Sequence, residues 1–342
     1  MLKFNRVIQI VSASRSGSSL FKTLLAQSPS LASLAGEEEP YFKMSGNGFG
    51  LTSDSDAFKT IVNAAKFREL IDTELTSEGH DAWVHRLTMQ FDGPQLHNLL
   101  DELPYMEPGE EVAWLKEQGI WGHYDGCHPS DRLPFYNFVY EMPPYVFPYS
   151  KPRITDTLLL KAPYNAYRRG VLEALFPEAQ FDYIFLHRNP GATINGLIDG
   201  WQAPYGFHKH KIPSNLKRNE TDGWWKFDMF PEWKQYALEP IPVIASMQWA
   251  RSWEHILTDY PCLSLNVRFE ELVDDPSHVV NRVCDELDIE RPPHTDHLPK
   301  VMSTEPPKPG RWKARAKIIE PLLTNHQPTI NALGYEDRYK WV

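Results

Sequence analysis

The apolar positions of the chain gather in short runs that predict buried strands. Three such runs, rich in Val, Ile, Leu and Phe, are residues 6–11, 157–161 and 181–187. Each run is followed by a segment with helical spacing of its apolar residues, at 20–27, at about 164–176, and from Pro190 onward. Strands that alternate with helices in this way predict a parallel sheet with helices on both faces.

The C-terminal half continues the same pattern. It predicts a helix over 243–258, a strand over 264–268 and two or three closing helices. Two long segments, at about 45–150 and 202–240, depart from it and are expected on the acceptor side. Residues 55–120 predict helical segments that alternate with turns, and residues 121–152 are rich in Pro, Tyr and Phe. Residues 202–240 hold several Trp, Pro and charged residues. Because no linker-like stretch separates the two segments from the rest, we expect insertions within one α/β domain that spans residues 1–342.

Composition and charge restrict the classes of partner. Lys and Arg total 35 and Asp and Glu total 45, so the formal net charge is −10. An acidic protein is repelled by phosphate, which argues against nonspecific binding to nucleic acid or to an anionic membrane. The 3 cysteines are too few for a disulfide framework, and no uncharged run approaches the ~20 residues of a membrane helix. We expect a cytoplasmic protein that binds neither nucleic acid nor a membrane. The sequence leaves its oligomeric state open.

The strongest local signal is the loop between the first strand and the first helix. Its sequence over residues 14–19 is Ser-Arg-Ser-Gly-Ser-Ser. Such a loop leaves backbone N–H groups at the positive end of a helix, which favours an anion, and Arg15 adds a charge suited to phosphate or sulfate. An ordinary serine–glycine helix cap is the alternative. The loop is not a nucleoside triphosphate P-loop, because Ser18 stands where that motif has its lysine.

With Leu20 included, this loop resembles the 5′-phosphosulfate loop of sulfotransferases. These enzymes use 3′-phosphoadenylyl sulfate (PAPS) as sulfuryl donor and release adenosine 3′,5′-bisphosphate (PAP). The resemblance implies a P-loop-like three-layer α/β fold, with a central parallel sheet flanked by helices and an inserted lid segment. It implies that the nucleotide is bound by Arg15, Ser16, Gly17, Ser18 and Ser19.

A second family signature binds the 3′-phosphate, and it consists of Arg-x-Pro after a strand and a serine eight residues after the arginine. Residues 187–190, His-Arg-Asn-Pro, match its first half, whereas the serine position is Gly196. The resemblance therefore implies a phosphate contact from Arg188 and leaves the second ligand open between Thr193, Asn195 and the Gly196 backbone N–H. Without the resemblance, the alternative interpretation of Arg188 is a surface residue at the end of a strand.

A third segment, residues 308–313 with the sequence Lys-Pro-Gly-Arg-Trp-Lys, resembles the late loop that closes over the nucleotide in this family. The resemblance implies that Arg311 and Lys313 meet the 3′-phosphate and that Trp312 packs near the adenine. Taken alone, the segment is a basic loop with a buried tryptophan.

Sulfuryl transfer requires a group that takes the acceptor proton, and protein cations neutralise the leaving phosphate, so no metal is expected. Three adjacent glutamates over 37–39 repel one another, and burial would raise the pKa of at least one toward a useful range. Similar sulfotransferases place a catalytic glutamate here, which aligns best with Glu39 and next with Glu38. A solvated acidic turn is the alternative.

Lys161 ends an apolar strand in a Lys-x-Pro segment, which resembles the segment that lies by the reacting group in carbohydrate-type sulfotransferases. Arg15 is counted with Lys161 among the groups that act on the reacting centre. His123 is an alternative base, because some sulfotransferases use histidine. The neighbouring Cys127 and His128 are adjacent and lack the spacing of a zinc site.

Aromatic residues around the second insertion form either an acceptor pocket or core packing: Trp201, Tyr205, Phe207, Trp224, Trp225, Phe227 and Trp233. Together the motifs predict a PAPS-dependent sulfotransferase that acts on a hydroxyl, alternatively an amine, of a small-molecule acceptor. The competing hypotheses are a P-loop-like nucleotide or small-molecule kinase and a non-catalytic nucleotide-binding protein.

Overall fold

The structure is a computed structural model that describes residues 1–34, 37–45, 63–76, 154–203, 208–216, 218, 223–260, 265–296, 298, 309–337 and 341. Its centre is a sheet with the strand order β2-β3-β1-β4-β7, in which all neighbours are parallel. The strands are β1 (Arg6–Val11), β2 (Ala32–Ser33), β3 (Thr157–Lys161), β4 (Gln180–His187) and β7 (Leu265–Arg268). The central position of β1 places the loop that follows it in the middle of the carboxyl edge.

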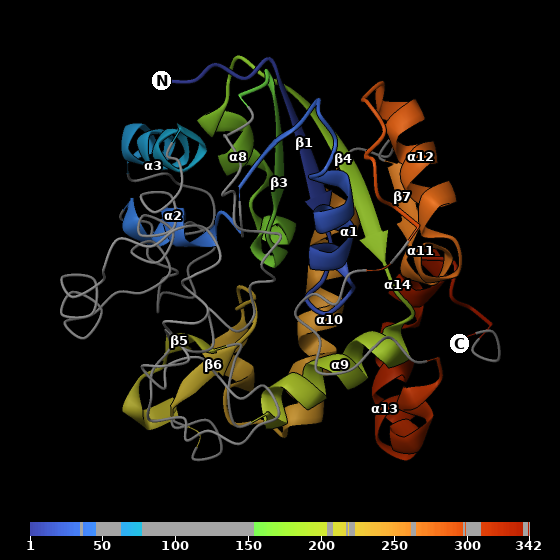
Figure 1. Ribbon diagram of the computed structural model, residues 1–342. Helices are drawn as coiled ribbons and strands as arrows, with labels where there is room; N and C mark the ends of the chain where they lie inside the picture. Colours follow the sequence, from blue (N-terminus) through green and yellow to red (C-terminus); the bar gives the residue numbers. More distant parts are fainter. Residues whose placement is uncertain are drawn as a thin grey trace, which may run out of the picture.

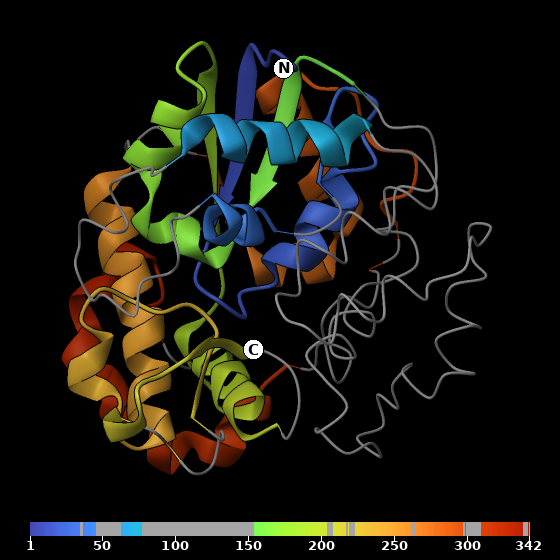
Figure 2. The same ribbon diagram turned by 90° about the vertical axis from the view of Figure 1, so that its left-hand side faces the viewer.

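Helices cover both faces of the sheet (Figures 1 and 2). They are α1 (Ser18–Leu25), α2 (Glu39–Met44), α3 (Ala64–Thr76), α8 (Arg169–Leu175), α9 (Pro190–Gln202), α10 (Ile241–Asp259), α11 (Phe269–Asp274), α12 (Pro276–Leu287), α13 (Ala316–Leu323) and α14 (Gln327–Ala332). Short 3₁₀ turns include η4 (Pro163–Tyr167) and η8 (Arg311–Arg315).

Alternation within β1 divides the core into two layers. Ile8 and Ile10 join one buried cluster with residues of α1, α11 and α12. Val7 and Val11 point to the opposite face and join a second cluster with residues of α2, α3, α8, α9 and α10. Because successive side chains of a strand point to opposite faces, a run that is apolar throughout requires helices on both sides. The predicted three-layer α/β fold is confirmed.

The predicted strands and most predicted helices are confirmed, with shifts of a few residues at their ends. After β7 the described residues form four helices, α11 to α14, where two or three were predicted. The helix predicted over 164–176 is wrong as a single element, because Arg168 has φ −130° and ψ 23° and separates η4 from α8. Its guanidinium lies over the Phe42 ring at 4.3 Å from the centroid. The two-residue strand β2 was not predicted.

The insertion predicted at 202–240 contains an antiparallel pair, β5 (His208–Lys211) and β6 (Trp224–Lys226). Of the aromatic residues assigned to this region, Trp201, Trp225, Phe227 and Trp233 are buried in the core, which favours the packing alternative for these four. Tyr205, Phe207 and the Trp224 side chain lie outside the described residues, as do His123, Cys127 and His128.

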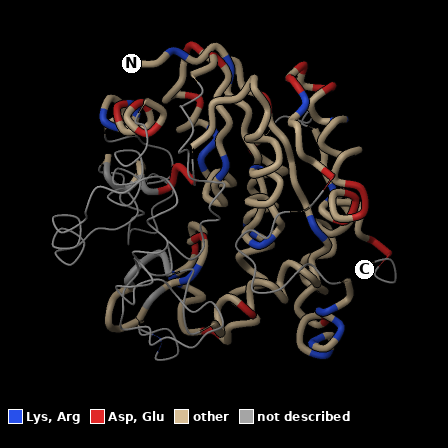
Figure 3. Tube along the Cα trace, in the orientation of Figure 1, with Lys and Arg blue, Asp and Glu red and all other residues tan. Residues whose placement is uncertain are grey.

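Charged positions lie mainly on peripheral helices and loops, and most of the central sheet is uncharged (Figure 3). In the part of the chain that the structure describes, no helix combines the length and the apolar character that crossing a membrane requires.

Candidate functional site

The loop between β1 and α1 depends on Gly17. This residue has φ +92°, in the left-handed region, and a Cβ there would lie 2.1 Å from the Phe269 Cε2 atom. Glycine alone tolerates both constraints, since it has no side chain to clash and adopts positive φ readily. The tight passage puts the N-terminus of α1 at the carboxyl edge of β1, where open α/β folds bind ligands.

Gly17→Ala is expected to lower the free energy of unfolding by more than about 1 kcal/mol, because alanine is strained at positive φ and its methyl group meets the Phe269 ring. Chemical denaturation measures this. Gly170→Ala is the matched control, since no atom lies within 4 Å of a Cβ built at this helical position. There, alanine is expected to stabilise by roughly 0.5–1 kcal/mol. Equal effects in the two variants would contradict the role of Gly17.

The serines of the loop have different surroundings. The Ser14 hydroxyl donates to the buried carboxylate of Asp228, which also accepts from the Tyr167 hydroxyl at 3.0 Å. Burial raises the pKa of Asp228. By contrast, the Ser16 Oγ atom is buried and has no hydrogen-bond partner among the described residues. A buried hydroxyl is normally hydrogen-bonded, so Ser16 fits a site whose partner is a bound group, while Ser14 fixes the loop.

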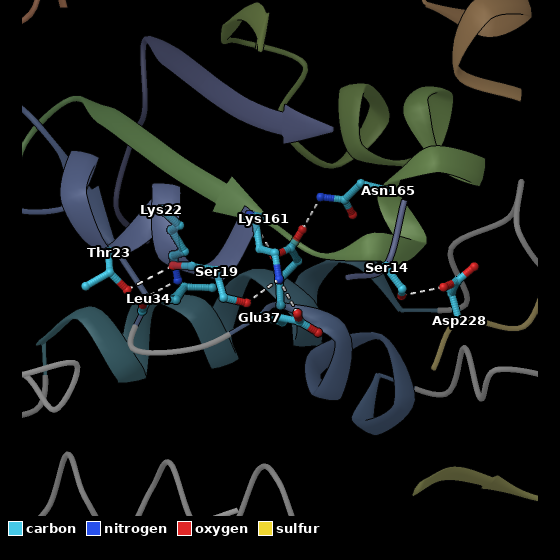
Figure 4. A network of polar contacts seen from close by, with 10 residues as sticks. Ser14, Ser19, Lys22, Thr23, Leu34, Glu37, Lys161, Asn165 and Asp228 are labelled. Carbon is cyan, nitrogen blue, oxygen red and sulfur yellow. Dashed lines mark hydrogen bonds and ion pairs between the residues drawn. The ribbon is translucent and has the colours of Figure 1, made fainter. Parts of the chain in front are cut away.

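Lys161 brings β3 and the acidic run to this loop (Figure 4). Its Nζ atom donates to the Ser19 Oγ atom at 2.9 Å and to a carboxylate oxygen of Glu37. The side chain of Lys161 is only 3% exposed, and that of Glu37 is 16% exposed. A buried ammonium requires such partners. The arrangement places one cation and one carboxylate directly beside the N-terminus of α1.

Glu38 and Glu39 have other contacts. Glu38 is fully buried and accepts hydrogen bonds from the Lys161 backbone N–H at 3.2 Å and from the Asn165 amide at 2.5 Å. Burial raises the pKa of Glu38, and the Asn165 hydrogen bond acts against that rise. Glu39 begins α2 and is also buried. Its charge raises the pKa of the buried Arg168 guanidinium, against the larger lowering effect of burial.

Arg188 lies just beyond the end of β4 and faces the same loop. Its Nη1 atom donates to the Arg15 carbonyl oxygen at 3.5 Å, and its guanidinium lies 4.7 Å from the centroid of the Phe269 ring. Burial lowers the pKa of Arg188 to about 10; the negative charge of Glu270 acts against this lowering, and the positive charges of Arg15 and Arg311 contribute to it. Arg188 therefore stays charged at neutral pH, and three guanidinium groups converge on one region.

The start of α9 holds this arginine in place. The Asn189 side chain accepts from the Ala192 backbone N–H at 2.7 Å and so caps the helix. Glu270 accepts from both the backbone and side-chain nitrogens of Asn189 at 2.9 Å and from the Tyr335 hydroxyl at 2.9 Å. A capped and hydrogen-bonded strand end fixes the direction in which Arg188 leaves the sheet.

His187 adds a pH dependence to this region. Burial lowers its pKa from 6.5 to about 4, and the Arg268 charge acts in the same direction. The unfolded chain therefore binds the proton more strongly than the folded protein. The free energy of unfolding should therefore carry no penalty from His187 above about pH 6.5. As the pH falls toward about 4, this residue is expected to lower it by about 3 kcal/mol in total.

Denaturant titrations between these two pH values test that expectation. His187→Asn should remove this part of the pH dependence, while the exposed His278→Asn should retain the wild-type slope. An unchanged slope in His187→Asn would contradict the assignment.

The residues of the predicted late loop, Arg311 to Lys313, lie at different distances from the site. Arg311 pairs with Asp199 at 3.1 Å and acts electrostatically on Arg188, whereas Lys313 is exposed. Trp312 is buried against α9, because a Cβ at Gly191 would lie 2.7 Å from its ring, and it packs on Trp341 with centroids 5.5 Å apart. The structure thus brings Arg311 toward the arginine cluster, and it places Trp312 in the core beside the start of α9.

Three residues that matter to this site were not singled out from the sequence. Glu37 was visible as the first member of the acidic run, whereas only the fold shows which carboxylate reaches Lys161. Asp228 and Phe269 lie far from the loop in sequence, so residue spacing does not connect them with it. Among the described residues, no group of three or more His, Cys, Asp or Glu side chains is placed to hold a metal ion.

Comparison with known proteins identifies the family of this chain. Its residues 8–293 match the model of the sulfotransferase family. Among solved structures, the sulfotransferase domain from the curacin biosynthetic pathway is 17% identical with a TM-score of 0.43, over 98% of this chain and 99% of that chain. The sulfotransferase domain from the Synechococcus PCC 7002 olefin synthase is 17% identical with a TM-score of 0.37, over 94% and 95%.

Sulfotransferase STF9 from Mycobacterium avium is 14% identical with a TM-score of 0.41, over 96% of this chain and 77% of that chain. Structural scores of this size support no conclusion by themselves, and no curated protein matches the chain. The family match spans well over half of the sequence, so this protein belongs to the sulfotransferase family.

Proposed function

We propose that the protein transfers a sulfuryl group from PAPS to a hydroxyl of a small-molecule acceptor in the cytoplasm, with an amine as the alternative acceptor group. The observation that carries the proposal is the convergence of the Ser14–Ser19 loop, Lys161 and Arg188 at the carboxyl edge of three neighbouring strands. A donor with phosphate groups at two ends requires cations at two separate places, and this edge offers both.

The residues at this edge fit such a donor. The Ser16 hydroxyl is buried without a protein partner in the described part of the chain, and the N-terminus of α1 has no side-chain cap. Backbone N–H groups and the helix dipole favour an anion there. When bound, PAPS supplies an activated sulfuryl group on a phosphate leaving group. The loop would hold the phosphosulfate, Arg188 and Arg311 would hold the 3′-phosphate, and Lys161 would lie beside the transferred group.

The proposed reaction needs a base on the acceptor side. The acceptor oxygen forms the new bond to sulfur, the bond between sulfur and the leaving phosphate oxygen breaks, and the acceptor proton passes to a glutamate. Glu39 and Glu38 remain sequence-based predictions for that role. The contacts favour Glu37, because its carboxylate touches the Lys161 ammonium and is partly exposed. The Glu38 carboxylate already accepts a hydrogen bond from the Asn165 amide, and the charge of Glu39 acts on the buried Arg168 guanidinium.

Donor binding would weaken the ion pair between Glu37 and Lys161. Without donor, the Lys161 ammonium has the Ser19 hydroxyl and the Glu37 carboxylate as partners. A negatively charged sulfuryl group beside Lys161 would compete for the same ammonium. Weakening the ion pair favours protonation of Glu37, since an adjacent positive charge stabilises the ionised carboxylate. Base strength would therefore increase once the donor is in place.

Calorimetry with PAP and ATP, followed by transfer assays with labelled PAPS and a panel of acceptors, tests the proposal. At a hundredfold excess over Kd, PAP should add about 2.7 kcal/mol to the free energy of unfolding. Binding of ATP with magnesium in place of PAP would support a kinase instead. Retention of PAP without transfer to any acceptor would support a non-catalytic binding protein.

A further inference from the structure

The inference concerns the position at which this chain departs from the family pattern, and it rests on the proposed function. Gly196 stands where the signature has the serine that contacts the 3′-phosphate. The three local substitutes are Thr193, Asn195 and the Gly196 backbone N–H. The surroundings of each one show whether it still has hydrogen-bonding capacity for a phosphate.

All three substitutes are already engaged. The Thr193 hydroxyl donates to the Asn189 carbonyl oxygen at 3.1 Å, within a fully buried side chain. The Asn195 amide oxygen accepts from the Arg315 Nη1 atom at 2.6 Å, and its nitrogen donates to Asp199 at 3.3 Å. Gly196 lies inside α9, where the helical hydrogen bond takes its N–H. These existing contacts favour a different residue for the second contact.

Arg15 occupies the space beside Gly196. A Cβ built on Gly196 would lie 3.4 Å from the Arg15 Cβ atom and 3.8 Å from its Nε atom. The guanidinium end of Arg15 therefore passes the position where the family's serine side chain would begin. Arg15 also has φ +67°, a conformation that is uncommon outside glycine. This conformation directs a loop residue toward α9, on the side of the arginine cluster.

Arg15 also adjoins the arginine of the signature. Its carbonyl oxygen accepts from the Arg188 Nη1 atom, and its charge lies close enough to disfavour the charged form of Arg188. Like charges at such proximity repel, and an anion bound between them would reduce this repulsion. A phosphate dianion offers oxygens to both guanidinium groups, and arginine suits it because its donors form a planar fork.

We propose that Arg15 replaces the missing serine and binds the 3′-phosphate of the donor nucleotide together with Arg188. The rival assignment is the one that the loop resemblance implies, in which Arg15 serves the 5′-phosphosulfate. The two assignments predict different responses to removal of a single phosphate from the ligand.

The test compares the affinities of PAP and adenosine 5′-monophosphate (AMP) by calorimetry. The ratio of the two affinities reports the contribution of the 3′-phosphate alone. Arg15→Ala is expected to lower this ratio by roughly ten- to a hundredfold, as for loss of a charge-assisted contact, while AMP affinity stays within about threefold of wild type. Equal weakening of PAP and AMP, with the ratio unchanged, would overturn the proposal in favour of the 5′ assignment.

A rescue variant adds a second readout. A Cβ at position 196 makes only ordinary contacts, so Gly196→Ser is compatible with the helix. In the Arg15→Ala background it should restore the ratio by roughly two- to tenfold, the effect of a neutral hydrogen bond. If Gly196→Ser changes PAP and AMP affinity by the same factor, position 196 does not face the 3′-phosphate and the proposal fails.

Arg291→Ala is the charge control, since Arg291 is exposed and pairs with Asp285 at 2.7 Å, away from α9. It should leave the ratio unchanged, and a fall as large as that in Arg15→Ala would show a general charge effect and overturn the proposal. Wild-type protein that binds neither nucleotide would refute the proposed function itself. Wild-type protein that binds PAP no more tightly than AMP would refute only the 3′ assignment.

Discussion

Replacing Glu37 by glutamine is expected to lower kcat by roughly 10²–10⁴-fold, the usual contribution of a positioned general base. Glutamine has nearly the same shape as glutamate but does not take up a proton at neutral pH. The carboxylate of Glu37 touches the Lys161 ammonium, which in turn donates to Ser19 at the start of α1. In the proposed reaction, an acceptor hydroxyl that approaches the transferred group beside Lys161 would meet this carboxylate.

The pH–rate profile separates a base from a structural partner of Lys161. In the wild type, kcat should decline toward acid as the base becomes protonated, and this acid limb should vanish in Glu37→Gln. PAP affinity should stay near wild type, because Glu37 is assigned to the acceptor side. A lower kcat with the acid limb intact would instead indicate that Glu37 acts by holding Lys161.

Matched variants decide between the carboxylates of the acidic run. Glu39→Gln and Glu38→Gln apply the same change one and two residues away, and His123→Ala tests the histidine alternative. We expect near-normal acid limbs in all three. A collapse of kcat and loss of the acid limb in Glu39→Gln, with Glu37→Gln near normal, would instead uphold the base predicted from the sequence.

The sequence predicts the strand ends and loops at the carboxyl edge well because their signals are local. An apolar run fixes β1, and Gly17 with its serines marks the turn into α1. The pair Arg188 and Pro190 marks the next strand end, since proline suits the first turn of a helix. In a parallel sheet these loops share the carboxyl edge. The approach of Arg188 to the loop follows from β4 being the neighbour of β1.

The remaining features depend on contacts between distant parts of the chain. Which glutamate reaches Lys161 depends on how the segment between β2 and α2 passes the end of β3, and adjacent residues point in different directions there. The break at Arg168 accompanies its packing on Phe42, which lies 126 residues earlier in the sequence. Similarly, the burial of Trp225 and Trp233 depends on packing with α9 and α10. Residue spacing alone carries none of this information.

Arg188→Ala is expected to raise KM for PAPS by roughly ten- to a hundredfold, since a charge-assisted hydrogen bond contributes about 1.5–3 kcal/mol. The expected fall in kcat is smaller, because the 3′-phosphate is remote from the transferred sulfuryl group. Burial and neighbouring charges lower the pKa of Arg188 only to about 10, so the wild-type residue carries its charge throughout the neutral range.

Two further measurements distinguish a phosphate contact from lost packing on Phe269. Arg188→Lys keeps a charge but removes the planar fork, and it should lie between wild type and alanine in PAP affinity. Arg188→Met keeps an unbranched side chain without charge, and it should lose PAP affinity as alanine does while AMP affinity stays near wild type. If Arg188→Met folds normally and retains the wild-type KM for PAPS, the Arg188 guanidinium has no part in binding the donor, and other cations must then bind the 3′-phosphate.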